Sequence, residues 1–72
     1  MIHNMQAIRH EYFSEAIRDG YSADDASEYA SIHLRLDVID RMAPEDWSKH
    51  AAQYHKATQR LEELQIKTWR NL

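Results

Sequence analysis

Histidine is the residue type with the widest chemical range in this chain of 72 residues. The histidines are His3, His10, His33, His50 and His55. Two metal ligands on one helix face need a separation of three or four residues, and no pair of these histidines has it. We therefore predict no metal site within a helix and no cofactor. A metal site assembled between helices or across a dimer stays open, as does pH-sensitive association through a titrating histidine.

The other side chains with catalytic potential stand in patterns typical of helix ends. The acidic pairs Asp24–Asp25 and Glu45–Asp46 lie where helices are expected to begin, and there negative charge favours the helix dipole. The serines lie in no nucleophile motif, and the chain has no glycine-rich phosphate loop. Cysteine is absent, which excludes a thiol nucleophile and cysteine-ligated zinc. We expect a protein that is not an enzyme.

Residues 44–71 predict one long helix that organises the chain. Pro44 suits the first helical position, and the segment contains no glycine. Apolar and small residues recur in steps of three and four, the spacing of one helix face. They are Trp47, Ala51 (or the bordering His50), Tyr54, Ala57 (or Thr58), Leu61, Leu64 and Thr68. We expect Trp47 and Tyr54 to lie in the core. At roughly 42 Å, this helix is too long for the rest of the chain to cover.

Two shorter helices are predicted before it, over about 2–19 and 23–41. Gly20 is the expected left-handed residue that ends the first helix, and Ser22 is the expected cap of the second. Residues 32–38 alternate apolar and polar side chains, so a strand paired with a second chain is the alternative there. A helix is favoured because no other segment supplies a partner strand.

The second predicted helix carries apolar residues on two sides. Ile32, Leu36 and Ile39 lie on one flank, and Leu34 and Val38 lie on another. A helix that is apolar nearly all round is expected to be buried nearly all round. Together with the over-long third helix, this pattern favours a homodimer.

Charge is distributed unevenly along the chain. Residues 1–46 carry ten acidic and four basic side chains, a net charge of −6, whereas residues 47–72 carry two acidic and five basic ones, a net charge of +3. An acidic front half that packs beside a basic helix explains this pattern. Two alternatives are an external anion on the basic helix and a DNA mimic on the acidic half. The candidate anion contacts are Lys49, Lys56, Arg60, Lys67 and Arg70.

The turn between the first two helices was compared with DNA-binding motifs. Ala16, Gly20, Ser22 and Ala26 loosely resemble the spacing of a helix-turn-helix over about 20 residues. Such a fold reads the major groove with its second helix. Here that helix begins with an acidic cluster, which phosphates would repel, so the sequence disfavours this interpretation.

No apolar run approaches the roughly 20 residues needed to span a bilayer, and the N-terminus lacks the apolar core of a signal peptide. We expect a soluble, cytoplasmic protein with a single domain over residues 1–72. A chain this short buries a small core, so tight packing or oligomerisation is expected to support it.

These patterns predict an all-α, three-helix bundle that forms a homodimer. The expected role is a non-catalytic protein-interaction module: an adaptor, inhibitor or regulator of a size common among accessory proteins of phages and mobile elements. The predicted contact residues are Ile32, Leu34, Leu36, Val38, Ile39, Leu61, Ile66 and Trp69. The alternative function is a small nucleic-acid-binding regulator that uses the basic residues of the third helix.

Overall fold

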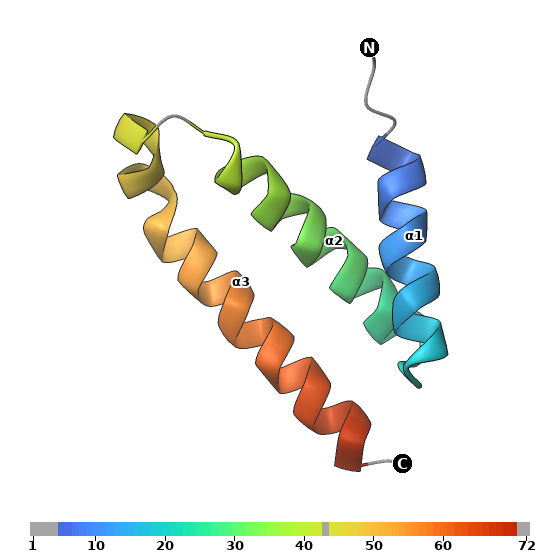
Figure 1. Ribbon diagram of the computed structural model, residues 1–72. Helices are drawn as coiled ribbons and strands as arrows, with labels where there is room; N and C mark the ends of the chain where they lie inside the picture. The colour runs from blue at the N-terminus through green and yellow to red at the C-terminus, as the bar shows by residue number, and fades with distance from the viewer. Residues whose placement is uncertain (1–4, 43, 71–72) are drawn as a thin grey trace.

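The computed structural model describes residues 5–42 and 44–70. It contains three helices, α1 (Met5–Arg18), α2 (Ala23–Asp40) and α3 (Pro44–Arg70), whose arrangement is shown in Figure 1. The predicted all-α, three-helix fold is confirmed. Residues 32–38 lie within α2, so the strand alternative is wrong. The expected beginning of α1 at residue 2, the end of α3 at residue 71 and His3 lie outside the described residues.

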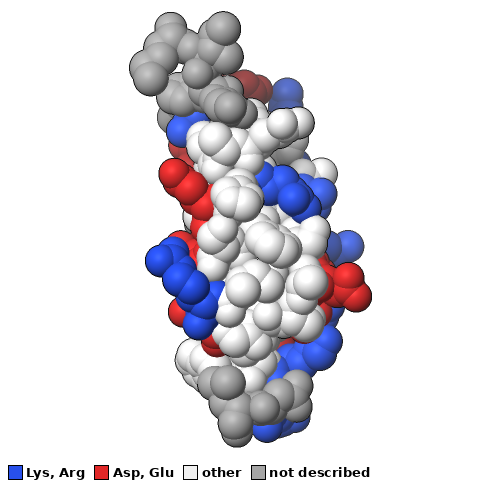
Figure 2. All heavy atoms as spheres, turned by 90° about the vertical axis from the view of Figure 1, so that its right-hand side faces the viewer, with Lys and Arg blue, Asp and Glu red and all other residues white. Residues whose placement is uncertain are grey.

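The three helices lie side by side in one layer. α2 occupies the middle and packs against α1 on one side and α3 on the other (Figure 1). In the described part of the chain, α1 and α3 do not pack against each other. The Cα atoms span 42 × 29 × 13 Å, and the molecule is narrow when seen from the α1 side (Figure 2). Both broad faces of the layer and its two outer edges therefore face solvent.

This arrangement partly explains why α2 is apolar on two sides. α2 has a neighbouring helix on two sides, and Ile32 and Ile39 of its first flank are buried within the chain, whereas Val38 of the second flank is 45% exposed. Part of the apolar pattern is therefore explained without a second copy. The second sequence argument for self-association still holds: the long α3 has a surface that no other helix of the described chain covers. None of the helices in the described segments combines the length and apolar character needed to cross a lipid bilayer.

The turn after α1 follows from a single glycine. Gly20 has φ 98°, the left-handed conformation that ends a helix. The Tyr21 N–H donates to the Ala16 carbonyl oxygen at 3.0 Å, and the Gly20 N–H donates to the Ile17 carbonyl oxygen at 3.1 Å. These two bonds form a Schellman motif, and the buried Tyr21 and Ala16 supply the apolar contact that accompanies it.

Two ion pairs align α3 against the start of α2. Lys67 Nζ lies 3.0 Å from Asp25 Oδ2. Arg60 donates to both Glu28 oxygens, at 2.6 Å from Nε and 3.0 Å from Nη2. These hydrogen bonds hold the pKa of the Glu28 carboxyl below its ordinary value of 4.5. An acidic front half does pack beside the basic helix, as the charge pattern predicts.

The buried core is small and rich in alanine. Ala16, Ala26 and Ala30 are completely buried, and such small side chains allow close helix packing. Ile39 and Leu64 are the largest side chains that are fully buried among the described residues. Few large apolar side chains therefore hold the layer together.

Because Leu64 is one of these few, its truncation is expected to leave a cavity. Leu64→Ala should lower the free energy of unfolding by about 2–5 kcal/mol. The matched variant Ile66→Ala, two residues away and exposed, should lower it by less than about 0.5 kcal/mol. Urea denaturation followed by circular dichroism measures both. Equal losses would contradict the observed packing of α3.

Candidate protein-interaction surface

The apolar stripe of α3 is covered along one edge only. At about 100° per residue, the buried Ala57 and Leu64 point toward α2, whereas Tyr54 and Leu61 point to one side of that direction. Both are half-buried, and Trp47 is 38% exposed. The prediction that Trp47 and Tyr54 lie in the core is therefore wrong. Its physical reason is that α1 does not reach α3, so no helix covers this part of the stripe.

The opposite side of the α2–α3 seam is polar. A shallow groove with a volume of about 220 Å³ runs along it and is called the polar groove here. The groove is lined by Glu28, Ile32, Arg35, Gln53, Lys56, Ala57 and Arg60. The two broad faces of the layer therefore differ in chemistry, because the exposed aromatic side chains of α3 lie on the side of the seam away from this groove.

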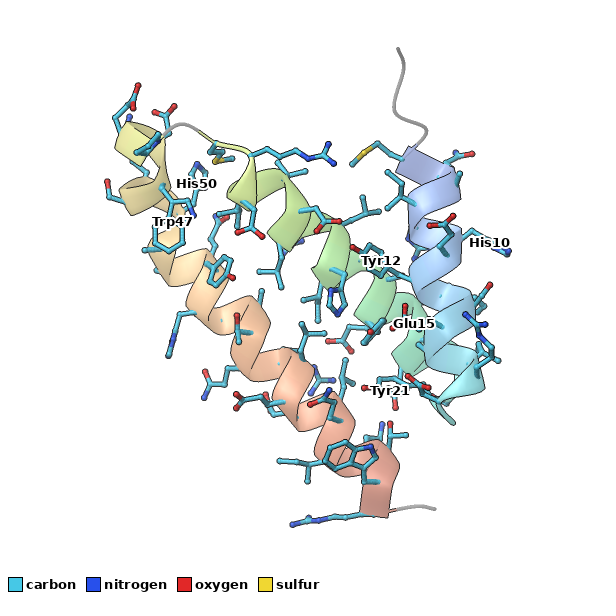
Figure 3. All side chains as sticks on the ribbon, in the orientation of Figure 1. His10, Tyr12, Glu15, Tyr21, Trp47 and His50 are labelled. Atoms are coloured by element: carbon cyan, nitrogen blue, oxygen red, sulfur yellow. The ribbon has the colours of Figure 1, made fainter. Side chains whose placement is uncertain are left out.

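α2 adds a second row to the face opposite the groove. Tyr29, His33 and Leu36 follow one another in steps of four and three, which places them on one side of the helix, away from Glu28 and Arg35. We call the combined surface the aromatic face. It consists of Tyr12, Tyr29, His33, Leu36, Trp47, Tyr54 and Leu61. Figure 3 shows Tyr12 along the seam between α1 and α2 and Trp47 near the start of α3.

Ring contacts join several of these side chains. Tyr12 stacks on His33 with ring centroids 4.8 Å apart, and His33 lies 4.4 Å from Tyr29. Tyr29 then meets the edge of Tyr21 at 5.2 Å. This row crosses from α1 over α2 to the turn. Since each ring packs against the next, the row presents a preformed surface.

On α3, Trp47 and Tyr54 form a separate pair. Their ring centroids lie 5.4 Å apart at an angle of 47°. The two residues are two helical turns apart, so the pair lines the uncovered N-terminal half of α3. His50, which the sequence placed beside the apolar stripe, is half-buried between these two turns (Figure 3).

Burial and neighbouring carboxylates raise the pKa of two tyrosines of the aromatic face, Tyr12 and Tyr29. The Tyr12 hydroxyl donates to Asp37 Oδ2 at 2.7 Å, and this bond, burial and the Asp37 charge raise the pKa of Tyr12 to about 12. Burial, followed by the charge of Glu15, raises the pKa of Tyr29 to about 12. The Tyr29 hydroxyl donates to Glu15 Oε1 at 3.5 Å. Near neutral pH these groups therefore donate hydrogen bonds rather than exchange protons.

Burial also keeps the His33 imidazole neutral. Burial between Tyr12 and Tyr29 lowers its pKa below the ordinary value of 6.5, and the nearby carboxylates of Asp37 and Glu15 only partly oppose this shift. The ring therefore packs as an aromatic side chain. The arrangement as a whole is suited to contact with another molecule through aromatic surface and hydroxyl groups.

The structure separates the predicted contact residues into three groups. Ile32 and Ile39 are buried within the single chain, so they stabilise the fold and offer no surface to a partner. Leu36 and Leu61 belong to the aromatic face. Leu34, Val38, Ile66 and Trp69 lie elsewhere: Leu34 is half-buried, and Trp69, near the C-terminal end of α3, is 65% exposed.

Tyr12, Tyr29 and His33 were not predicted from the sequence to lie on a contact surface. A signal for two of them is present, because Tyr29, His33, Leu36 and Asp40 share the spacing of one helix face. That pattern identifies a face of α2 but not whether another helix covers it. Tyr12 joins this face only through the packing of α1 on α2.

The basic residues of α3 are largely engaged within the chain. Arg60 and Lys67 pair with α2, and Lys49 lies 3.9 Å from Asp46. The acidic first turn of α2 faces α3 through these pairs, and α2 has a helix on either side of it. A recognition helix in the major groove needs an open side that carries positive charge. The fold therefore gives no support to the helix-turn-helix resemblance.

Among the residues that the structure describes, no three histidine or carboxylate side chains are grouped closely enough to bind a metal ion. Figure 3 illustrates the separation of the histidines, with His10 on the outer side of α1 and His50 near the start of α3.

Comparison with known proteins found no matching family model, no similar curated protein and no similar solved structure. The function is therefore inferred from the surfaces of this molecule.

The packing of His33 predicts a stability that depends on pH. Because the folded state holds the ring neutral while the unfolded imidazole binds a proton near pH 6.5, stability should fall as the pH is lowered from about 7.5 to about 5.5. In the variant His33→Gln, the free energy of unfolding should decrease less over this pH range than in the wild type. Urea denaturation at several pH values measures it.

The exposed His55 provides the control, because His55→Gln should keep the dependence of the wild type. Glu28 contributes at lower pH, since its carboxyl is protonated only below its ordinary pKa. The role given to His33 would be contradicted if the free energy of unfolding depended on pH equally in both histidine variants, or if it rose on acidification.

Proposed function

We propose that this chain is a small, non-catalytic protein-interaction module, an adaptor, inhibitor or regulator that docks its aromatic face onto a partner protein. One observation supports this proposal above others. Globular domains are built from at least two packed layers of secondary structure, and this chain supplies one. A partner that covers the aromatic face adds the second layer.

The side chains of this face suit recognition. Tyrosine and tryptophan combine a large apolar ring with a hydrogen-bonding group, and they are enriched where interfaces gain most of their binding energy. Here the Tyr12 and Tyr29 rings are already held by His33 and by the carboxylates of Asp37 and Glu15. Ordered side chains lose little conformational entropy on binding, which favours affinity.

We further propose that two copies associate through the outer face of α1, the side turned away from α2. Figure 2 shows a continuous band of uncharged side chains there, with charged residues along both sides. Arg9 is turned toward α2, where it donates to Ser27 Oγ at 2.7 Å. A two-fold interface sets each patch against its own copy. An uncharged patch satisfies this condition because it brings no like charges together.

A shallow hollow of about 460 Å³ borders this face and is lined by Gln6, Arg9, His10 and Phe13. Phe13 also packs against the buried core, whereas Ile17, one turn further along α1, is 42% exposed. In a two-fold pair, Ile17 of each copy would add apolar surface to the contact. Since α1 is only about 21 Å long, the dimer is expected to depend on concentration.

The aromatic face is tested by variants that leave the buried core intact. Wild-type protein, the double variant Trp47→Ser/Tyr54→Ser, and the polar-groove variant Arg35→Ser/Lys56→Ser are each used to capture partners from cells of the source organism. A captured protein is then purified and titrated against all three by calorimetry. We expect the first double variant to weaken binding by tenfold or more, since aromatic anchors each contribute about 1–2 kcal/mol or more. The second should bind like the wild type.

Weaker binding by the polar-groove variant, with unchanged binding by the aromatic variant, would contradict this function. Salt-sensitive binding to DNA that survives the aromatic substitutions and is lost with Arg35 and Lys56 would identify a nucleic-acid-binding regulator instead. Circular dichroism of each variant checks that the helices are retained.

The dimer is tested by size-exclusion chromatography with light scattering over a range of protein concentrations. We expect the mass to rise from 8.6 kDa toward twice that value. Ile17→Glu should hold the protein at the mass of one chain, because it places a charged carboxylate in the uncharged contact. Val38→Glu is the matched control: Val38 is 45% exposed, Ile17 is 42% exposed, and Val38 lies on α2. A mass of one chain at every concentration, or an equal effect of both variants, would overturn the dimer.

A further inference from the structure

The aromatic face has a charged border on α1. Glu15 contacts the Tyr29 hydroxyl, which places it at the edge of this face. Glu11 and Asp19 lie four residues before and after Glu15, so they follow the same side of the chain. All three carboxylates are exposed. Arg18, three residues after Glu15, lies at the outer edge of this side, so the α1 side of the aromatic face carries three carboxylates and one cation, an excess of negative charge.

α2 extends this border. Asp37 accepts the hydrogen bond from Tyr12, and Asp40 continues the row of Tyr29, His33 and Leu36 by one further step of four residues. We call the five carboxylates the acidic rim: Glu11, Glu15, Asp19, Asp37 and Asp40. The cations of α3 do not balance it on this face, since Lys56 and Arg60 line the polar groove on the other side of the seam.

The charges of the rim are close enough to act on the rings. Asp37 and Glu15 both contribute to the raised pKa of Tyr12, and Glu15 and Asp19 contribute to that of Tyr29. The hydrogen bond to Asp37 is the main cause of the raised pKa of Tyr12, and burial is the main cause for Tyr29; the charges of the rim add to both. Carboxylates beside these rings favour cations over anions on this face.

We infer that the partner segment on the aromatic face is an amphipathic helix whose apolar stripe is flanked by lysine or arginine. This inference rests on the proposed function and adds the chemistry of the partner. From Trp47 to Leu61 the open stripe of α3 comprises 15 residues with a rise of about 21 Å, which matches a helix of four turns. Its aliphatic side chains pack on Leu36 and on the rings of Tyr54 and Tyr29, and its cations face the acidic rim.

The charge of the rim also selects against the other occupants. A second copy of this chain would bring an identical row of carboxylates to the same face, and like charges disfavour that contact. Nucleic acid and anionic lipid would present phosphates to the same carboxylates. A cationic helix avoids both conflicts, and its lysine or arginine groups gain further contacts with the aromatic rings.

The experiment is a selection from displayed helical peptides. The library fixes leucine along one helix face and varies the flanking positions among lysine, glutamate, glutamine and serine, and the intact chain is the target. We expect the selected peptides to carry lysine along one flank. A selected peptide is then synthesised and titrated by calorimetry at two salt concentrations. Higher salt should weaken its binding to the wild type.

Variants of the protein identify the contacts. Glu11→Gln and Asp40→Asn should each weaken binding by about two- to fivefold and reduce its dependence on salt, as expected for exposed charge pairs. Asp24→Asn is the matched control, because this exposed carboxylate lies on the opposite side of α2 and should have no effect. Tyr54→Ser should abolish binding.

The outcomes separate the two levels of inference. Selected peptides with glutamate or uncharged flanks that still depend on Tyr54 would overturn the cationic helix and leave the interaction module standing. A selection that yields no binder, or binders indifferent to Tyr54→Ser, would overturn both.

Discussion

The structure depends on one constraint: only α2 has helices packed on two sides. α1 and α3 each bury a single side against it, so the layer gains its stability from a few alanines and from Ile32, Ile39 and Leu64. The ion pairs of Arg60 with Glu28 and of Lys67 with Asp25 add little free energy, because such partly exposed pairs contribute about 0–1 kcal/mol. Their main effect is on register, since they set α3 along the start of α2. The open faces follow directly from this packing.

The parts of the fold that local interactions determine were predictable from the sequence. Gly20 and Ser22 mark the turn between α1 and α2, because a left-handed residue and a side-chain cap act within a few residues of the helix end. Pro44 marks the beginning of α3 in the same way. The uneven charge predicted that α3 lies beside the acidic half of the chain. The helices and their order are therefore encoded in short segments.

The candidate site was less predictable because it depends on which neighbour each helix face meets. Trp47 and Tyr54 have the spacing of core residues, and only the absence of a helix over that side of α3 exposes them. Conversely, Ile32 and Ile39 resemble contact residues in the sequence, but both are buried within the single chain. The same ambiguity affects α2, whose two apolar flanks fit a dimer from sequence and in part fit two intramolecular neighbours in the structure. Periodicity identifies apolar faces, but not their partners.

A single layer with an ordered aromatic face and a border of one charge can be understood as part of a larger helical assembly. A helix on the aromatic face would bury Tyr54, Leu61 and Leu36 from the open side and so complete a two-layer core. Binding of this kind stabilises the folded state, because a ligand that binds only the folded chain shifts the unfolding equilibrium toward it. In a chain with so small a core, contacts with such a partner would also supply part of the stability of the fold. Recognition and folding would then be coupled through the same side chains.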